Sequence, residues 1–253
     1  MPHIIKLSSW VLEQEEIRDY FYKKELNPSF WSADGEFDPA IRKKLLDIAQ
    51  DFFKDLKIEV PVEDIQLTGS LANFNWTKNS DLDVHVLVDF TKIDPNVELV
   101  KKGLDGQRFL WNLRHNVVIR THDVELYVQD IKEPHVASGL FSLLNNEWIK
   151  TPKYSDPQID YKDVDSKFNG FVNDIHGLEN RLAEEMQGEA DARELYEYAQ
   201  KIKSRILKAR KEGLANSGEF SVENLAFKKL RNEGYIEKLI DLISKAYSKI
   251  YNE

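Results

Sequence analysis

The chain has 253 residues, of which 42% are hydrophobic and 31% charged, a composition typical of a soluble globular protein with one large domain or two smaller ones. Its formal net charge of −9 argues against a general binder of polyanions, and the absence of cysteine excludes disulfides, thiolate metal sites and a cysteine nucleophile. Residues 1–16 lack the apolar core and cleavage site of a signal peptide, and no long apolar run predicts a transmembrane helix. We therefore expect a cytoplasmic protein with no membrane partner.

The first part of the chain alternates helical and β-rich segments. Residues 11–24 predict a short amphipathic helix, and residues 39–56 predict a second helix that begins at a proline. Residues 65–68 predict a short strand that ends at a Gly-Ser turn. Further strands are predicted at 82–90, 117–119 and 124–128, the last two paired as neighbours, and a helix is predicted at 105–114.

The composition changes near residue 150. Residues 151–163 hold two Pro, three Asp and two Tyr, and we interpret them as a linker. Beyond it no segment reads as a strand, and helical periodicity with strong helix formers predicts helices at 168–186, 191–211 and 221–251. Ser221 is a suitable N-cap for the last of these. The expected fold class is therefore α+β, with a small mixed sheet and flanking helices in residues 1–150 and an all-helical domain in residues 164–253.

Two acids stand at the start of the apolar strand predicted at 82–90. Residues two apart on a strand share a face and lie about 6.5–7 Å apart, so Asp81 and Asp83 project together while Leu82 and Val84 pack on the other side. Such a like-charged pair is retained by solvent exposure, by cationic partners or by divalent metal ions. The flanking run reads as an interior strand, which argues against full exposure. Mg²⁺ binds carboxylates and substrate phosphates, so the pair is chemically suited to this ion. Two such ions can stabilise the entering and leaving oxygens of a phosphoryl displacement.

Two further features converge on this pair. Gly69 and Ser70 follow the strand at 65–68 and are expected to open a helix through residues 71–75, with backbone N–H groups available to a phosphate. A later strand places Glu125 between two apolar residues, as a third acid that can join the pair if the strands are adjacent. Asp123 lies on the same strand face and remains a rival for this role.

The ordered pattern of these residues resembles the polymerase-β-like nucleotidyltransferase superfamily. It reads apolar-Gly-Ser, ten residues, Asp-apolar-Asp-apolar, and then apolar-Glu-apolar on a later strand. The wider stretches LTGSLANFNWTKNSDLDVHVLVDF, HDVELYVQD and GEFSVENLAFKKLRNEGYIEKL resemble nucleotidyltransferases predicted in tailed bacteriophages. The resemblance implies that residues 1–150 form the catalytic domain, that residues 164–253 close the nucleotide cleft, and that a phage-encoded protein would act in the host cytoplasm.

The resemblance also implies a reaction and a set of site residues. An acceptor hydroxyl would attack the α-phosphate of an NTP such as ATP, so that an NMP is transferred and pyrophosphate leaves. Asp81 and Asp83 would bind two Mg²⁺ or Mn²⁺ ions with the NTP, and Glu125 would hold the catalytic ion and help to activate the hydroxyl. The third acid is often Asp in the superfamily, so a Glu here keeps Asp123 in contention. The implied nucleotide-binding residues are Gly69, Ser70 and Ser80.

Several alternatives stay open at this point. The chain could be a nucleotide- or RNA-binding module without catalysis, or a pyrophosphokinase of related fold, although the basic and Tyr/His-containing motif of that group is not found downstream. His85 shares the face of the two Asp, where a structural role is the more common one for a lone His. The acceptor could be an RNA end, a protein hydroxyl, a small molecule or a second nucleotide, and the negative net charge disfavours long nucleic acid. The sequence specifies neither the base preference nor the oligomeric state.

Overall fold

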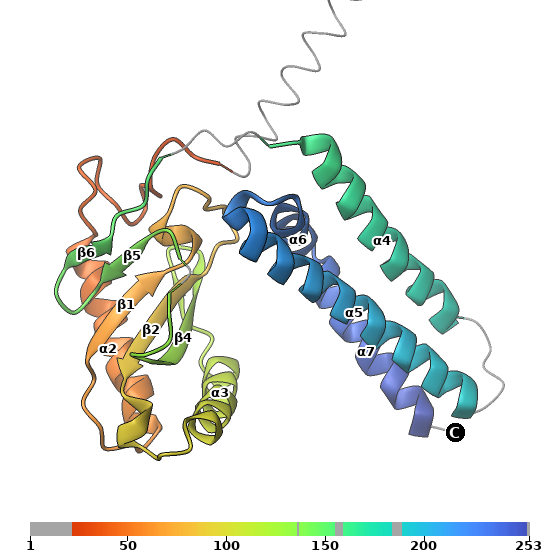
Figure 1. The fold of residues 1–253 in the computed structure, drawn as a ribbon, viewed down its shortest axis with the longest axis horizontal. Coiled ribbons are helices and arrows are strands. Elements are labelled where there is room, and N and C mark those ends of the chain that lie inside the picture. The colour runs from red at the N-terminus through yellow and green to blue at the C-terminus, as the bar shows by residue number, and fades with distance from the viewer. Residues whose placement is uncertain (1–21, 136, 155–158, 184–188, 252–253) are drawn as a thin grey trace, which may run out of the picture. The chain divides into compact units, whose positions relative to one another are not determined.

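The computed structural model of the chain describes residues 22–135, 137–154, 159–183 and 189–251 (Figure 1). These form two compact units, a sheet unit within residues 19–155 and a helical unit within residues 156–253. A six-stranded mixed sheet with flanking helices precedes an all-helical region, which confirms the expected α+β class. No helix in the described ranges is both long and apolar enough to cross a membrane.

The sheet has the strand order β3-β4-β2-β1-β5-β6. Two interior strands, β2 (Leu82–Val88) and β4 (His122–Asp130), run parallel, and every other neighbouring pair is antiparallel. Both were expected as strands, as were β1 and β3, whereas the short strands β5 and β6 were not predicted. The remaining strands are β1 (Asp64–Thr68), β3 (Val118–Ile119), β5 (Leu140–Ser142) and β6 (Glu147–Lys150).

Helices α2 (Pro39–Asp55) and α3 (Val97–Arg114) contribute to one apolar core with the sheet. The predicted start of α2 is confirmed, because Pro39 is its first residue and the Asp38 carboxylate accepts hydrogen bonds from the first-turn N–H groups. The rings of Phe52 on α2 and Trp111 on α3 lie 5.2 Å apart. The side chains that β2 turns toward this core, Leu82, Val84 and Val86, are fully buried, as the sequence predicts. The polar residues that alternate with them therefore lie on the other face.

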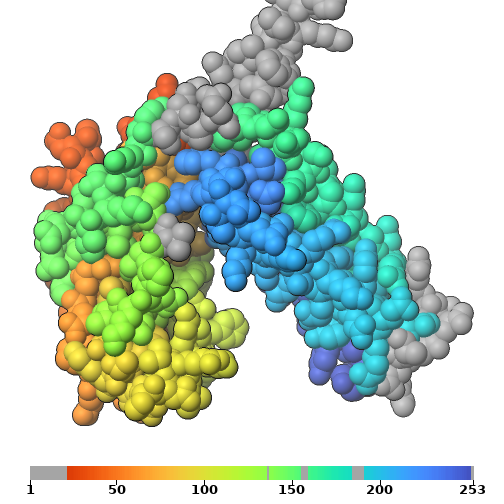
Figure 2. Space-filling view, viewed as in Figure 1, coloured from red at the N-terminus to blue at the C-terminus, as the bar shows by residue number. Residues whose placement is uncertain are grey.

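Helix α3 begins well before the predicted residue 105 and lies beside the outer edge of β4. The Asn96 side chain caps it by accepting a hydrogen bond from Leu99 N at 3.1 Å. The Asn112 side-chain amide makes hydrogen bonds of 3.2 Å to both the N–H and the C=O of Leu126. The two-residue strand β3 does not extend far enough along β4 to pair with Leu126. The helix thereby satisfies backbone groups that an edge strand would leave open. In the space-filling view, α3 lies at the surface of the sheet unit (Figure 2).

The helical unit consists of α4 (Tyr161–Ala183), α5 (Glu189–Ser217), α6 (Val222–Asn232) and α7 (Tyr235–Tyr251). The predicted single helix at 221–251 is wrong, because the chain breaks between α6 and α7 at Gly234, which has a φ of +79°. The N-cap role of Ser221 is confirmed, since its hydroxyl accepts a hydrogen bond from Asn224 N. Helix α4 begins inside the segment 151–163 that the sequence predicts as a linker.

The predicted helix at 11–24 falls mostly outside the described residues. Its described end, residues 22–24, is not helical. The backbone there extends instead, and Lys23 N donates a hydrogen bond to Phe74 O at 2.7 Å. This part of the prediction is therefore wrong, because a tertiary contact outweighs the local helical pattern.

Candidate active site

Three acids lie at one end of the parallel strands β2 and β4. Asp83 of β2 is the register partner of Glu125 on β4, and both residues are half-buried. Side chains at paired positions of neighbouring strands share a face, and such strands lie about 4.8 Å apart. Asp81, which is also half-buried, stands two residues earlier, just before β2 begins. The fold thus supplies the strand adjacency on which the role of Glu125 depended.

Asp123, the rival third acid, occupies a different environment. It is exposed and pairs with Val118 of β3, whereas the ladder between β2 and β4 begins one residue later, at Leu82 and Val124. Glu125 is therefore the acid that faces Asp83. Which of the two acids acts in catalysis remains a prediction.

The turn after β1 brings the backbone of Gly69 against the Asp83 side chain. Thr68 is the register partner of Asp83, so the next residue leaves the sheet beside that carboxylate. Gly69 has φ +75° and ψ −159°, a region that residues with a Cβ rarely adopt. A Cβ at this position would also overlap the Asp83 carboxylate. The sequence predicts a glycine here because the turn is tight. The structure gives a second reason, which is the close approach of the Asp83 carboxylate to the Gly69 backbone.

Ser70 opens a short 3₁₀ turn (Ser70–Ala72), so the predicted helix through residues 71–75 is wrong. The helix ends because Asn73 has an extended backbone and its side-chain oxygen accepts a hydrogen bond from Phe74 N at 2.8 Å. The hydroxyls of Ser70 and Ser80 are hydrogen-bonded at 2.7 Å, and Ser80 also accepts from Thr77 N at 2.9 Å. Ser80 is only 2% exposed. It therefore braces the turn that carries Ser70, and its predicted contact with the nucleotide remains a prediction.

Tyr127 is a site residue that the sequence reasoning missed. Its hydroxyl donates a hydrogen bond to Glu125 Oε2 at 2.8 Å, and the Arg108 guanidinium lies 4.2 Å from its ring centre. Burial, together with the neighbouring Glu125 carboxylate, holds the pKa of the Tyr127 phenol above its usual range, so the phenol keeps its proton. The available signal was its spacing, because Tyr127 stands two residues after Glu125 on the same strand face.

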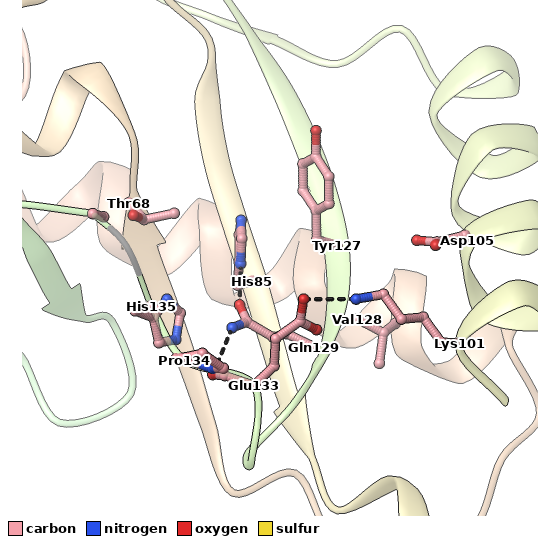
Figure 3. A pocket seen from close by; sticks show the side chains of 11 residues that line it. Thr68, His85, Lys101, Asp105, Tyr127, Val128, Gln129, Glu133, Pro134 and His135 are labelled. Carbon is pink, nitrogen blue, oxygen red and sulfur yellow. Dashed lines mark hydrogen bonds and ion pairs between the residues drawn. The ribbon is translucent and has the colours of Figure 1, made fainter. Parts of the chain in front are cut away.

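A pocket adjoins the acids on the same face, one row further along β2 and β4 (Figure 3). His85 and Tyr127 are register partners in that next row. Burial lowers the pKa values of both the His85 and the His135 imidazoles, so both are neutral at pH 7. We name this cavity of about 290 Å³ the histidine pocket; its polar lining includes Thr68, His85, Tyr127, Gln129, Glu133 and His135.

The acids suit a hard cation in their chemistry and in the space around them. Carboxylate oxygens are preferred ligands of Mg²⁺, which commonly takes one or two carboxylates and completes its shell with water and substrate phosphates. Because Gly69 has no side chain, the Asp83 carboxylate fits against the turn that would contact those phosphates. No three His, Asp or Glu side chains within the described ranges lie close enough together to hold a metal ion by themselves. Binding of a metal ion by these acids together with a triphosphate remains a prediction.

The sheet unit can now be compared with known protein families. Residues 43–144 match the family model described as "Nucleotidyltransferase domain". The nucleotidyltransferase match spans the Gly-Ser turn and all three acids, and it ends before the helical unit. It supports nucleotidyl transfer as the general activity and the polymerase-β-like superfamily as the wider kinship. No curated protein and no solved structure matches the chain, so the resemblance to bacteriophage proteins remains a prediction.

Proposed function

We propose that the protein is a metal-dependent nucleotidyltransferase that moves an NMP from an NTP to an acceptor hydroxyl. The acceptor hydroxyl loses its proton, for which Glu125 is the candidate base, and its oxygen forms a bond to the α-phosphorus. The bond from the α-phosphorus to the bridging oxygen breaks, and pyrophosphate leaves with that oxygen. The observation that carries the proposal is the register between β2 and β4, which sets Glu125 opposite Asp83 beside the Gly69 turn.

Each residue has a role that follows from its position. Asp81, Asp83 and Glu125 would hold Mg²⁺ or Mn²⁺, and two such ions would neutralise charge on the attacking and leaving oxygens when bound. The backbone of Gly69 and the hydroxyl of Ser70 would contact the β- and γ-phosphates. Tyr127 keeps the Glu125 carboxylate oriented through its hydrogen bond, and Ser80 holds Ser70 in place.

The test uses NTPs labelled separately at the α- and γ-phosphates, with Mg²⁺ or Mn²⁺ and acceptors of several classes. We expect α-label to enter a product, with release of pyrophosphate, for the wild-type chain. The Asp81→Ala/Asp83→Ala variant should release none. Circular dichroism and thermal unfolding check that the variant is folded.

Other outcomes point elsewhere. Transfer of the γ-label would establish a kinase or pyrophosphokinase instead. NTP binding without transfer of either label, with every acceptor class supplied, would leave a binding module. Full activity in the double variant would contradict the assigned acids.

A further inference from the structure

The histidine pocket adjoins the acids that the proposed function assigns to the reacting phosphate. His85 and Tyr127 stand two residues after Asp83 and Glu125 on the same strands, and thus about 6.5–7 Å further along the same face. Thr68 lines the pocket and is also the register partner of Asp83. A molecule held in this pocket therefore lies directly beside the acids.

The size of the pocket restricts what it can hold. Its volume of about 290 Å³ is at the lower end of the range of roughly 300–1,000 Å³ that is usual for small-molecule sites. A single small molecule fits this space. A polymer would have to be recognised by its end alone.

Two of the three aromatic rings that line the pocket are stacked, and the third is tilted against them. The His85 ring stacks on Tyr127 with ring centres 4.8 Å apart, and on its other side it faces His135, with ring centres 6.0 Å apart (Figure 3). Arg108 lies against the Tyr127 ring at 4.2 Å. The faces of His85 and Tyr127 that meet each other are thus covered, which leaves less ring surface for stacking on an aromatic base.

The hydrogen bonds around His85 determine what it offers to a ligand. Gln129 Nε2 donates to Glu133 O at 3.3 Å, which orients the amide so that its oxygen faces His85 Nδ1 at 2.6 Å. Because it faces a carbonyl oxygen, Nδ1 must carry a proton. Nε2 is then the ring nitrogen that is left to meet a hydroxyl of a ligand.

The charges around the pocket disfavour an anionic ligand. Lys101 Nζ is paired with Glu133 Oε1 at 2.6 Å, so the one lysine of the lining is neutralised by a neighbour. The carboxylate of Asp105 is also part of the lining. Arg108, which lies against the Tyr127 ring, offsets the charge of Asp105, and the acids in the adjacent row leave the surroundings negative on balance.

We propose that the histidine pocket binds the acceptor, and that the acceptor is a small uncharged molecule that carries several hydroxyl groups. One hydroxyl donates a hydrogen bond to His85 Nε2, and another lies toward the row of Asp83 and Glu125. The remaining hydroxyls bind at the polar edges of Thr68 and His135. This inference rests on the proposed nucleotidyl transfer for its biological meaning, although the binding itself can be measured without it.

The first experiment measures binding without NTP or metal, by saturation-transfer NMR. The uncharged probes are myo-inositol, glucose and glycerol; glucose 6-phosphate and gluconate supply anions, and adenosine supplies an aromatic base. We expect at least one uncharged polyol to receive saturation from the wild-type chain. His85→Phe keeps a ring in the stack but removes both nitrogens, and it should weaken this binding about tenfold, as expected for loss of roughly 1.4 kcal/mol. The matched control is His115→Phe, whose ring also stacks on an aromatic residue, Trp111, but lies outside the pocket.

The second experiment supplies the same probes and a short oligonucleotide as acceptors for α-labelled NTP. We expect the label to enter an uncharged polyol, and His85→Phe to raise the KM for that acceptor about tenfold while the KM for NTP stays unchanged. Thr68→Val, in which a methyl replaces the hydroxyl, gives a second test if His85→Phe does not fold.

Every other result overturns the inference, either the polyol site itself or its role as the acceptor site. The polyol site is ruled out if only anions or adenosine bind, or if no polyol binds at millimolar concentrations. It is also ruled out if polyol binding is unchanged in both His85→Phe and Thr68→Val. Label that enters only the oligonucleotide or a protein would leave the proposed function standing and remove the assigned acceptor. Label that enters nothing, although polyols bind in the pocket, would remove the proposed function and leave a polyol site.

Discussion

Asp83 on β2 and Glu125 on β4 face each other across the parallel pair in the interior of the sheet, although 41 residues separate them along the chain. Each stands between buried apolar neighbours that turn to the opposite face. The Tyr127 hydroxyl holds one oxygen of Glu125, and the backbone of Gly69 approaches Asp83 closely. Predictions about the site can therefore be tied to single contacts.

The first prediction concerns the identity of the third acid. Glu125→Gln keeps the shape of the side chain and its place opposite Asp83 but removes the charge, so transfer should fall by roughly 100-fold or more. Asp123→Asn is the matched control, because this exposed acid pairs with β3 and lies outside the ladder with β2. Steady-state transfer rates check both variants. A large loss in Asp123→Asn with near-normal rates in Glu125→Gln would exchange the two assignments.

The second prediction concerns the turn at Gly69. Gly69→Ala places a Cβ on the Asp83 carboxylate and adds backbone strain of about 1–3 kcal/mol, so both stability and transfer should fall. Gly35→Ala is the control, because Gly35 has a φ of +79° but open space around its Cβ position. Chemical denaturation measures the two losses. Equal losses, with transfer intact in both variants, would show that the contact with Asp83 is unimportant.

A third prediction isolates the hydrogen bond between Tyr127 and Glu125. Tyr127→Phe keeps the ring that stacks on His85 and removes only the hydroxyl, which should cost about 0.5–1.5 kcal/mol of unfolding free energy. We expect kcat to fall while the KM for NTP stays the same, since the hydroxyl orients Glu125 and does not contact the nucleotide. Tyr127→Leu, which also removes the ring, should be less stable than Tyr127→Phe. An unchanged kcat in Tyr127→Phe would argue against an orienting role.

The fourth prediction concerns pH. Burial lowers the folded-state pKa values of His85 and His135 below the ordinary value of 6.5, so below that pH the unfolded chain binds more protons than the folded chain. The free energy of unfolding should therefore decrease as the pH falls through 6.5 toward the lowered pKa values. The groups that act on His85 include Arg108, Glu133 and His135 itself.

Denaturation curves between pH 5 and pH 8 measure this effect. The His85→Gln/His135→Gln variant should lose part of the pH dependence, while the His115→Phe variant should keep the pH dependence that these two residues cause. Identical slopes for the wild-type chain and the double variant would mean that neither imidazole is held neutral by the fold.

The sequence alone was sufficient for the elements that local physics specifies. Proline and a capping acid start α2, and alternation of apolar and polar residues marks β2 and β4. The spacing of Gly69, Asp81 and Glu125 carries the resemblance to nucleotidyltransferases, which the family match over residues 43–144 supports. Local sequence patterns did not predict helix ends or strands that depend on a tertiary contact or on a single backbone angle. The helix expected after Ser70 stops at Asn73, the helix at 221–251 breaks at Gly234, and the short strands β5 and β6 gain their hydrogen bonds only from neighbours in the sheet.

What the tertiary structure alone decided is which residues meet. Period-two spacing specifies the face of a strand on which a side chain lies, and so it determined that Asp83 and His85 share a face, as do Glu125 and Tyr127. It carries no information about which strands pair or in which register. The parallel register of β2 and β4 sets Glu125 rather than Asp123 opposite Asp83, and it joins His85 to Tyr127 in the floor of the histidine pocket. Strand pairing depends on burial and hydrogen bonds between segments far apart in the chain, and only the folded chain brings those segments together.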